Sequence, residues 1–385
     1  MKQTILVILG FALYAVASCV EPYNPPEIES AVNFLVVDGI VDMADPETSI
    51  KLTRSQNLNE QGLPAPEVGA YVRVEVVNGP EFILPEIAPG VYSASGVNVD
   101  DGQECILKIS TSSGAEYVSD PVTSKVSPPI DSITWTAGGS NVEFEVTTHD
   151  PEGDSRYYRW KTVETVMYHS AHHSSLIWDP GLGDVRSRTP QENIYNCWKT
   201  TPFGTIDVFT TNGLVEDAVR KHTVLRMPAN SWKLSLQYSL LVRQCVIDQK
   251  EFNFWTELRK NTESIGTIFD PQPTEVTGNI HSVNAAGDKT LGYFSLGRSV
   301  EKRIFVEWSE LPYPYSSYER PFPDCNAFAV DTILIGDYLK SNKSALLITA
   351  ATSGPAVIGY VTAEKHCIDC TLVYGGTPIK PDFWE

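Results

Sequence analysis

Three histidines lie close together in the sequence, at His169, His172 and His173, and Asp179 and Asp184 follow them. Imidazole and carboxylate groups are common ligands of zinc and of other transition metals. The spacing of the histidines does not place three ligands on one face of a helix. We therefore interpret these residues as polar decoration of a loop, and a metal site at the three histidines remains the alternative.

A second group of potential ligands lies near the C-terminus. Cys367 and Cys370 are separated by two residues, His366 precedes them and Cys325 lies upstream. Thiolates at this spacing could share a zinc ion, form a redox pair or take part in structural disulfides. The flanking residues are β-like and rich in glycine and proline, whereas a redox cysteine favours the start of a helix. We predict a structural disulfide between Cys325 and one member of the pair.

Acidic residues alternate from Asp150 to Asp154 and could offer oxygen ligands to calcium. A complete calcium loop needs a further bidentate carboxylate, but aromatic and basic residues occupy that stretch, at 157–160. We interpret the acidic segment as a turn that joins two paired strands, at 142–147 and 157–162.

Aromatic side chains are plentiful in the predicted loops. Trp178 and Trp198 lie near the longest stretch without periodicity, and Tyr313, Tyr315 and Tyr318 follow one another closely. Rings on loops provide flat apolar contacts for a sugar or a peptide, although rings packed beneath loops are equally common. These five residues are the candidates for a binding site.

The motifs that identify common enzymes do not occur in the sequence, which has no nucleophile elbow, zinc-protease helix, Walker loop or dinucleotide-binding glycine pattern. The 385 residues include 48 acidic and 29 basic side chains, and the formal net charge of −19 argues against nucleic-acid binding. Residues 20–154 hold 23 of the acidic and 5 of the basic side chains. This acidic region could keep the protein soluble or dock a basic partner.

The elements that position these residues are predicted to be mainly β-strands. Short alternating runs separated by turn residues extend from residue 33 to 126, which is typical of a β-sandwich and resembles transthyretin-like or carboxypeptidase-regulatory domains. Two prolines at 128–129 mark a boundary before a fibronectin- or immunoglobulin-like sandwich. We predict tandem sandwiches at 31–126 and 127–310, followed by a cysteine-containing segment at 311–385 that packs on the second sandwich.

The second sandwich is predicted to carry two further features. Residues 167–200 lose their periodicity and form a long insertion, of a length that is usually functional or mobile. Residues 249–262 are predicted to form a helix, because Asp248 is a good N-cap, apolar residues recur at helical spacing and Gly266 follows the end.

The N-terminus has the pattern of a lipoprotein signal. The basic residue Lys2 precedes an apolar stretch that is too short to span a bilayer. The sequence Val-Ala-Ser-Cys at 16–19 resembles the bacterial lipobox, in which removal of residues 1–18 leaves Cys19 as the lipidated first residue. Residues 19–30 would form a proline-rich tether. The other six cysteines suit an oxidising compartment and allow 15 pairings.

Several motifs along the chain occur in the order and spacing of a known family: Ser127-Pro-Pro-Ile-Asp-Ser, Tyr157-Tyr-Arg-Trp, Gly266-Thr-Ile-Phe-Asp-Pro-Gln-Pro and Lys380-Pro-Asp-Phe-Trp. They resemble the Bacteroidota lipoproteins of the domain of unknown function 4249 family. The resemblance implies an exported lipoprotein, often encoded beside a TonB-dependent outer-membrane transporter, with no catalytic residues assigned. It also implies that the disulfide candidates Cys197, Cys325, Cys367 and Cys370 are typical of the family, whereas Cys105 and Cys245 are peculiar to this sequence.

The leading interpretation is a non-enzymatic, lipid-anchored accessory protein of the outer membrane that acts with a TonB-dependent transporter in substrate capture or complex assembly. We expect it on the cell surface rather than on the periplasmic face, and we expect no cofactor. The alternatives are a metal-dependent hydrolase of the cell envelope that uses the three histidines, and a purely structural surface lipoprotein.

Overall fold

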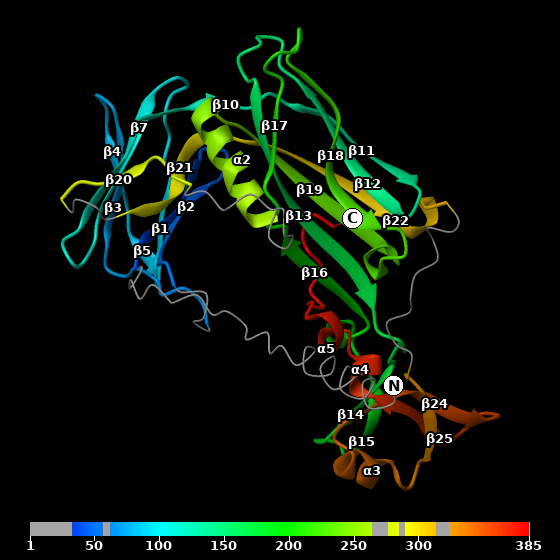
Figure 1. Cartoon of the computed structure of the whole chain (residues 1–385). Helices are drawn as coiled ribbons and strands as arrows, with labels where there is room; N and C mark the ends of the chain where they lie inside the picture. The colour runs from blue at the N-terminus through cyan, green and yellow to red at the C-terminus, as the bar shows by residue number, and fades with distance from the viewer. Residues whose placement is uncertain (1–32, 57–61, 264–275, 285–288, 313–323, 385) are drawn as a thin grey trace, which may run out of the picture.

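A computed structural model describes five stretches of the chain: 33–56, 62–263, 276–284, 289–312 and 324–384. Most of the sheets are antiparallel, which confirms the predicted mainly β fold and its β-sandwich architecture. Two sandwiches lie side by side, helix α2 (Gln249–Glu263) lies at their junction, and a smaller C-terminal unit in orange and red lies beyond the second sandwich (Figure 1). No helix in the described part is long and apolar enough to cross a membrane.

The first sandwich encloses a core of mainly aliphatic side chains between two sheets. Alternation along β3 (Tyr71–Val76) buries Val72, Val74 and Val76 on the face that points into this core. In spatial order, one sheet contains β10 (Lys125–Val126), β21 (Thr290–Arg298), β1 (Leu35–Asp42), β2 (Glu47–Arg54), β6 (Val91–Ser95) and β5 (Glu86–Ala88). The other contains β20 (Ile280–Ser282), β8 (Glu116–Ser119), β7 (Glu104–Ser110), β3 (Tyr71–Val76) and β4 (Glu81–Leu84), with β9 (Val122–Thr123) beside β7.

Strands β20 and β21 come from the region 127–310, which the sequence pattern assigned to the second sandwich, but they lie in the first. Strand β21 runs parallel to β1, and its residues Phe294 and Leu296 are buried in the first core. The two backbones approach closely at Gly292, where an added Cβ would lie 1.9 Å from the carbonyl oxygen of Val37. The first sandwich is therefore completed by a segment far away in the chain, and the boundary at residue 126 does not describe it.

The second sandwich packs large aromatic side chains between its sheets, including Phe144, Tyr158, Trp160 and Tyr238. One sheet contains β11 (Ile130–Gly138), β12 (Asn141–His149) and β18 (Ala218–Pro228). The other contains β16 (Asn196–Pro202), β13 (Tyr157–His169), β19 (Gln237–Val246) and β22 (Val300–Glu307), with β17 (Asp207–Thr210) beside β13.

The predicted pairing of the strands at 142–147 and 157–162 is wrong, because β12 and β13 lie in opposite sheets. The acidic segment between them is a turn that crosses from one sheet to the other. The Asp150 carboxylate accepts hydrogen bonds from the backbone amides of Glu152, Asp154 and Ser155 and from the Ser155 hydroxyl. Alternation alone is compatible with either arrangement, so the pattern did not distinguish them.

The predicted helix at 249–262 is confirmed as α2. The Asp248 carboxylate caps it by accepting the Glu251 backbone amide at 2.7 Å. Phe254 packs against Tyr293 of β21, with ring centroids 5.1 Å apart, while the ring of Trp255 lies 3.5 Å from the guanidinium carbon of Arg159 on β13. One helix face therefore contacts both sandwiches.

The C-terminal unit forms from the insertion at 167–200 together with the end of the chain. The predicted long loop contains the hairpin β14–β15 and continues into strand β16, so it is more regular than its sequence suggested. The Ser175 backbone amide donates to the Ile348 carbonyl at 2.8 Å, which ties the insertion to β24. The unit contains β14 (Leu176–Asp179), β15 (Asp184–Ser187), a sheet of β23 (Phe328–Asp331), β25 (Ala356–Glu364) and β24 (Ala345–Ser353), and the helices α3 (Ile335–Ser341), α4 (Lys365–Ile368) and α5 (Thr371–Tyr374).

Short 3-10 helices occur at η1 (Pro190–Glu192), η2 (Trp232–Leu234) and η3 (Trp308–Glu310). The C-terminal segment also contacts the second sandwich, because the Trp198 backbone amide of β16 donates to the Thr377 carbonyl at 2.9 Å. The lipidation candidate Cys19 and the binding candidates Tyr313, Tyr315 and Tyr318 lie outside the described residues.

Candidate functional site

The three histidines of the predicted loop lie where the insertion meets the C-terminal unit, and each contacts protein groups. The His169 ring stacks on Tyr195 with centroids 4.8 Å apart, and the edge of His173 meets the same ring at 5.0 Å. His172 Nε2 lies 3.0 Å from the Cys325 carbonyl oxygen, at hydrogen-bond distance. Within the described ranges, the histidines do not form a set of metal ligands; the group with ligand spacing lies elsewhere.

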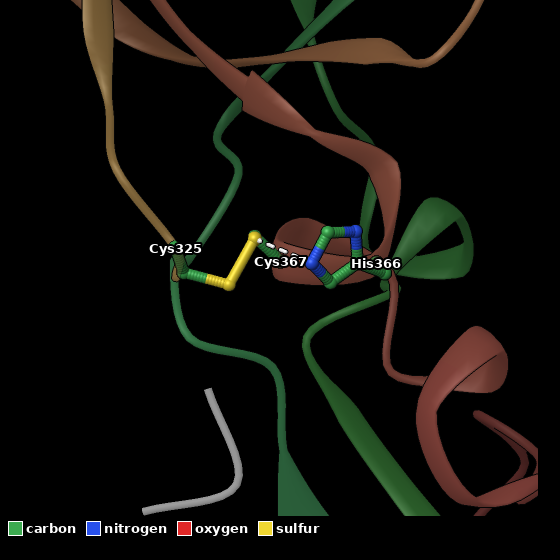
Figure 2. A group of neighbouring side chains, drawn as sticks. All are labelled: Cys325, His366 and Cys367. Atoms are coloured by element: carbon green, nitrogen blue, oxygen red, sulfur yellow. Dashed lines mark hydrogen bonds between the residues drawn. A yellow bond between two sulfur atoms is a disulfide. The ribbon is translucent and has the colours of Figure 1, made fainter. Parts of the chain in front are cut away.

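That group consists of Cys325, His366 and Cys367, and Figure 2 shows that the two cysteines form a disulfide. His366 Nε2 lies 3.3 Å from Cys367 Sγ, and its Nδ1 lies 3.3 Å from a Glu364 carboxylate oxygen. Because the two sulfurs are bonded to each other, neither is a thiolate that could hold a metal. The predicted structural disulfide between Cys325 and one member of the pair is confirmed, with Cys367 as its partner.

The second member of that pair, Cys370, forms a disulfide with Cys197 of β16, and both residues are fully buried. The Tyr168 hydroxyl donates to the Cys370 carbonyl at 3.0 Å. Since Cys367 and Cys370 bond to different partners, they are not a redox pair with each other. Each disulfide instead ties the C-terminal segment to another part of the chain.

The remaining thiols, Cys105 and Cys245, are free and are not paired with each other. Cys105 lies in the core of the first sandwich, and Cys245 lies near the junction of the two sandwiches. Burial raises the pKa of each thiol to about 11. Both are therefore protonated at neutral pH and are poor nucleophiles.

The two predicted tryptophans have different environments. Trp198 is only 7% exposed and packs edge-on against Trp384, so it supports the fold. Trp178 on β14 is half-buried and lines a cavity of about 410 Å³ between the hairpin β14–β15, helix α3 and strand β24. One of the predicted binding residues therefore lines a cavity in the described part of the molecule.

The hairpin that carries Trp178 is held by a network around Arg186. This guanidinium pairs with Asp179 at 2.8 Å and with both carboxylate oxygens of Glu192, at 2.7 and 2.8 Å. Hydrogen bonds from Arg186, and then from the Thr189 backbone amide, lower the pKa of Glu192 to about 2. The network fixes both strands of the hairpin and η1 next to the cavity.

Two other cavities are less suited to a ligand. A cavity of about 580 Å³ at one end of the second sandwich is lined by polar side chains that contact one another: Arg220 pairs with Glu216 at 2.8 Å, and His149 Nδ1 lies 2.8 Å from an Asp131 carboxylate oxygen. The cavity at the junction of the sandwiches, lined by Arg159 and other residues, measures only about 30 Å³, which is room for water.

Comparisons with individual known proteins show little similarity. No curated protein matches the chain. The interferon gamma receptor alpha chain of chicken is 11% identical, with 56% of this chain and 90% of that one covered at a TM-score of 0.15. A DUF3823 family protein from Parabacteroides merdae is 12% identical, with 56% and 92% covered at a TM-score of 0.12. Neither likeness supports an inference about function.

The family comparison covers most of the described fold. A family model described as a domain of unknown function (DUF4249) matches residues 20–303. The match includes the first sandwich with its returning strand β21, the insertion that carries Trp178 and most of the second sandwich. It agrees with the resemblance of the sequence motifs, and the chain belongs to the DUF4249 family.

Proposed function

We propose that this protein is a non-enzymatic, lipid-anchored accessory protein of the outer membrane of a Bacteroidota cell, and that it acts with a TonB-dependent transporter in substrate capture or complex assembly. The observation that carries the proposal is the pair of disulfides, since such bonds persist outside the cytoplasm. The lipobox-like sequence before Cys19 supports the anchor, and the resemblance to lipoproteins often encoded beside such transporters supports the partner.

The use of the potentially reactive side chains favours a binding protein over a hydrolase. His172 lies against the Cys325 carbonyl oxygen, the four paired cysteines form disulfides, and the free thiols have raised pKa values. The cavity beside Trp178 is lined by that tryptophan, aliphatic side chains and cations, and its described lining holds no nucleophile beside a base. These arrangements suit a binding or structural protein better than a hydrolase, and the cavity beside Trp178 favours binding.

Replacing the lipidated residue tests the anchor. Cys19→Ala is expected to move most of the full-length protein from the membrane fraction to the soluble fraction, because several acyl chains on one residue give durable attachment and no helix of the described part is long and apolar enough to cross a membrane. The measurement is sedimentation of membranes followed by immunoblotting. Cys105→Ala, which removes a cysteine from the core, serves as the control and should stay with the membranes. Membrane retention of Cys19→Ala would refute the anchor.

Protease added to intact cells tests the side of the membrane. We expect the wild-type protein to be digested, since the proposal places it on the cell surface. Protection that lasts until the outer membrane is permeabilised would place it on the periplasmic face instead.

A further inference from the structure

The cavity beside Trp178 has an apolar floor. Ile177 of the hairpin, Leu339 of α3 and Leu346 of β24 contribute aliphatic side chains, and all three are partly exposed. The Trp178 indole packs against Gly336, where an added Cβ would lie 2.9 Å from the indole Cη2. Glycine at this position therefore allows the ring to lie close against α3. A half-buried indole next to aliphatic side chains provides a flat apolar surface for a ligand.

The rim of the same cavity is positively charged. Arg188, Lys343 and Lys365 line it, and none of its described lining residues is acidic. Lys343 and Lys365 are exposed and form no ion pair with any described residue. This contrasts with Arg186, which pairs with two carboxylates, with Arg243, which pairs with three, and with the net charge of −19 of the whole chain.

Arg188 is held in place by neutral groups. Its Nε donates to the Ser174 hydroxyl at 2.9 Å, and its Nη1 donates to the Glu192 carbonyl at 3.2 Å. Partial burial, opposed by the charges of Glu192 and Asp369, lowers the pKa of this guanidinium, which remains charged because its ordinary pKa is so high. An ordered guanidinium that pairs with no carboxylate of a described residue can donate hydrogen bonds to a bound anion.

We propose that this cavity binds an organic anion, a carboxylate attached to a flat apolar body of about the size of a bicyclic ring. The volume of about 410 Å³ lies within the range of small-molecule sites. The apolar body stacks on Trp178 and the aliphatic floor, and the carboxylate faces the three cations. The inference goes beyond the proposed function, because it requires neither the lipid anchor nor a transporter.

A matched pair of probes tests the site. Indole-3-acetate and indole-3-acetamide have nearly the same shape but differ in charge, and each is titrated by calorimetry into the detergent-solubilised full-length protein. We expect the carboxylate to bind about tenfold more tightly than the amide, as charge-assisted hydrogen bonds are stronger than neutral ones. Equal affinities, or no detectable binding of either probe at millimolar concentration, would overturn the proposal.

Variants then locate the binding. The double variant Lys343→Gln/Lys365→Gln should weaken carboxylate binding about fourfold and leave amide binding unchanged, because each exposed charge contributes a factor of about two. Trp178→Ala should weaken both probes about tenfold. Lys340→Gln, on α3 three residues before Lys343 but outside the lining of the cavity, is the matched control and should change neither. Carboxylate binding that is unchanged in the double lysine variant would show that the probe binds elsewhere, which would also overturn the proposal.

Discussion

Replacing both Cys197 and Cys370 with alanine is expected to lower the free energy of unfolding by about 5 kcal/mol. The bond joins residues 173 positions apart, and a cross-link over so long a loop removes much conformational entropy from the unfolded chain. Around it, Tyr168 hydrogen-bonds the Cys370 carbonyl and Tyr374 stacks on Trp232 with centroids 3.6 Å apart. The disulfide and these contacts attach the end of the chain to the second sandwich. Loss of the disulfide should therefore loosen the C-terminal unit first.

Guanidinium chloride denaturation followed by circular dichroism measures this effect. The pair Cys325→Ala/Cys367→Ala provides the comparison, since its loop of 42 residues predicts a slightly smaller loss of about 4 kcal/mol. A reductant should destabilise the wild type but not a variant that lacks both disulfides, because Cys105 and Cys245 are free. A loss below about 1 kcal/mol for Cys197→Ala/Cys370→Ala would show that the bond does not cross-link the native fold.

Glu251→Ala is expected to destabilise the protein by about 3 to 5 kcal/mol, because it leaves Arg159, whose side chain is only 11% exposed, without its carboxylate. Glu251 lies on α2 and is 4% exposed. Its carboxylate accepts hydrogen bonds from Ser295 of β21 at 2.6 Å and from Trp255 at 2.9 Å, and it lies 3.8 Å from the guanidinium of Arg159 on β13. Burial raises the pKa of Glu251 and lowers that of Arg159. One side chain thus links the helix to both sandwiches.

Thermal and chemical denaturation of matched variants separate the contribution of the Glu251 charge to stability from that of side-chain packing. Glu257→Ala, at an exposed position of the same helix, should change stability by less than about 0.5 kcal/mol. The double variant Arg159→Met/Glu251→Leu should recover much of the loss, since apolar replacement of a buried ion pair is often neutral. If Glu251→Ala were no more harmful than Glu257→Ala, the link between the sandwiches would depend on other contacts.

Local patterns in the sequence predicted the type of each element better than its partners. Alternation at Val72, Val74 and Val76 identified a strand, and the cap at Asp248 identified a helix, because both signals depend on neighbours in the chain. The pairing of Leu35 with Thr290 spans 255 positions and depends on a glycine that lets two backbones approach. Such long-range contacts leave no local pattern, which is why β21 was assigned to the wrong sandwich.

The candidate site was predictable only in part for the same reason. The sequence predicts Trp178 as a binding residue because it is an aromatic residue near a long stretch without periodicity. It also predicts that Cys325 forms a disulfide with either Cys367 or Cys370. The cations Arg188, Lys343 and Lys365 come from three separate segments and have no common spacing, so only the fold shows that they surround one cavity. That the three cations pair with no carboxylate of a described residue is a property of the folded molecule as well.

The central claim, that the protein acts with a TonB-dependent transporter, is tested most directly by isolating the affinity-tagged chain from detergent-solubilised outer membranes of its own cells after mild crosslinking. Quantitative mass spectrometry then measures what accompanies it. We predict a TonB-dependent transporter in near-equal amount to the wild-type chain, and much less of it with Cys19→Ala, which lacks the proposed anchor. Recovery of the wild-type chain with no transporter would contradict the account.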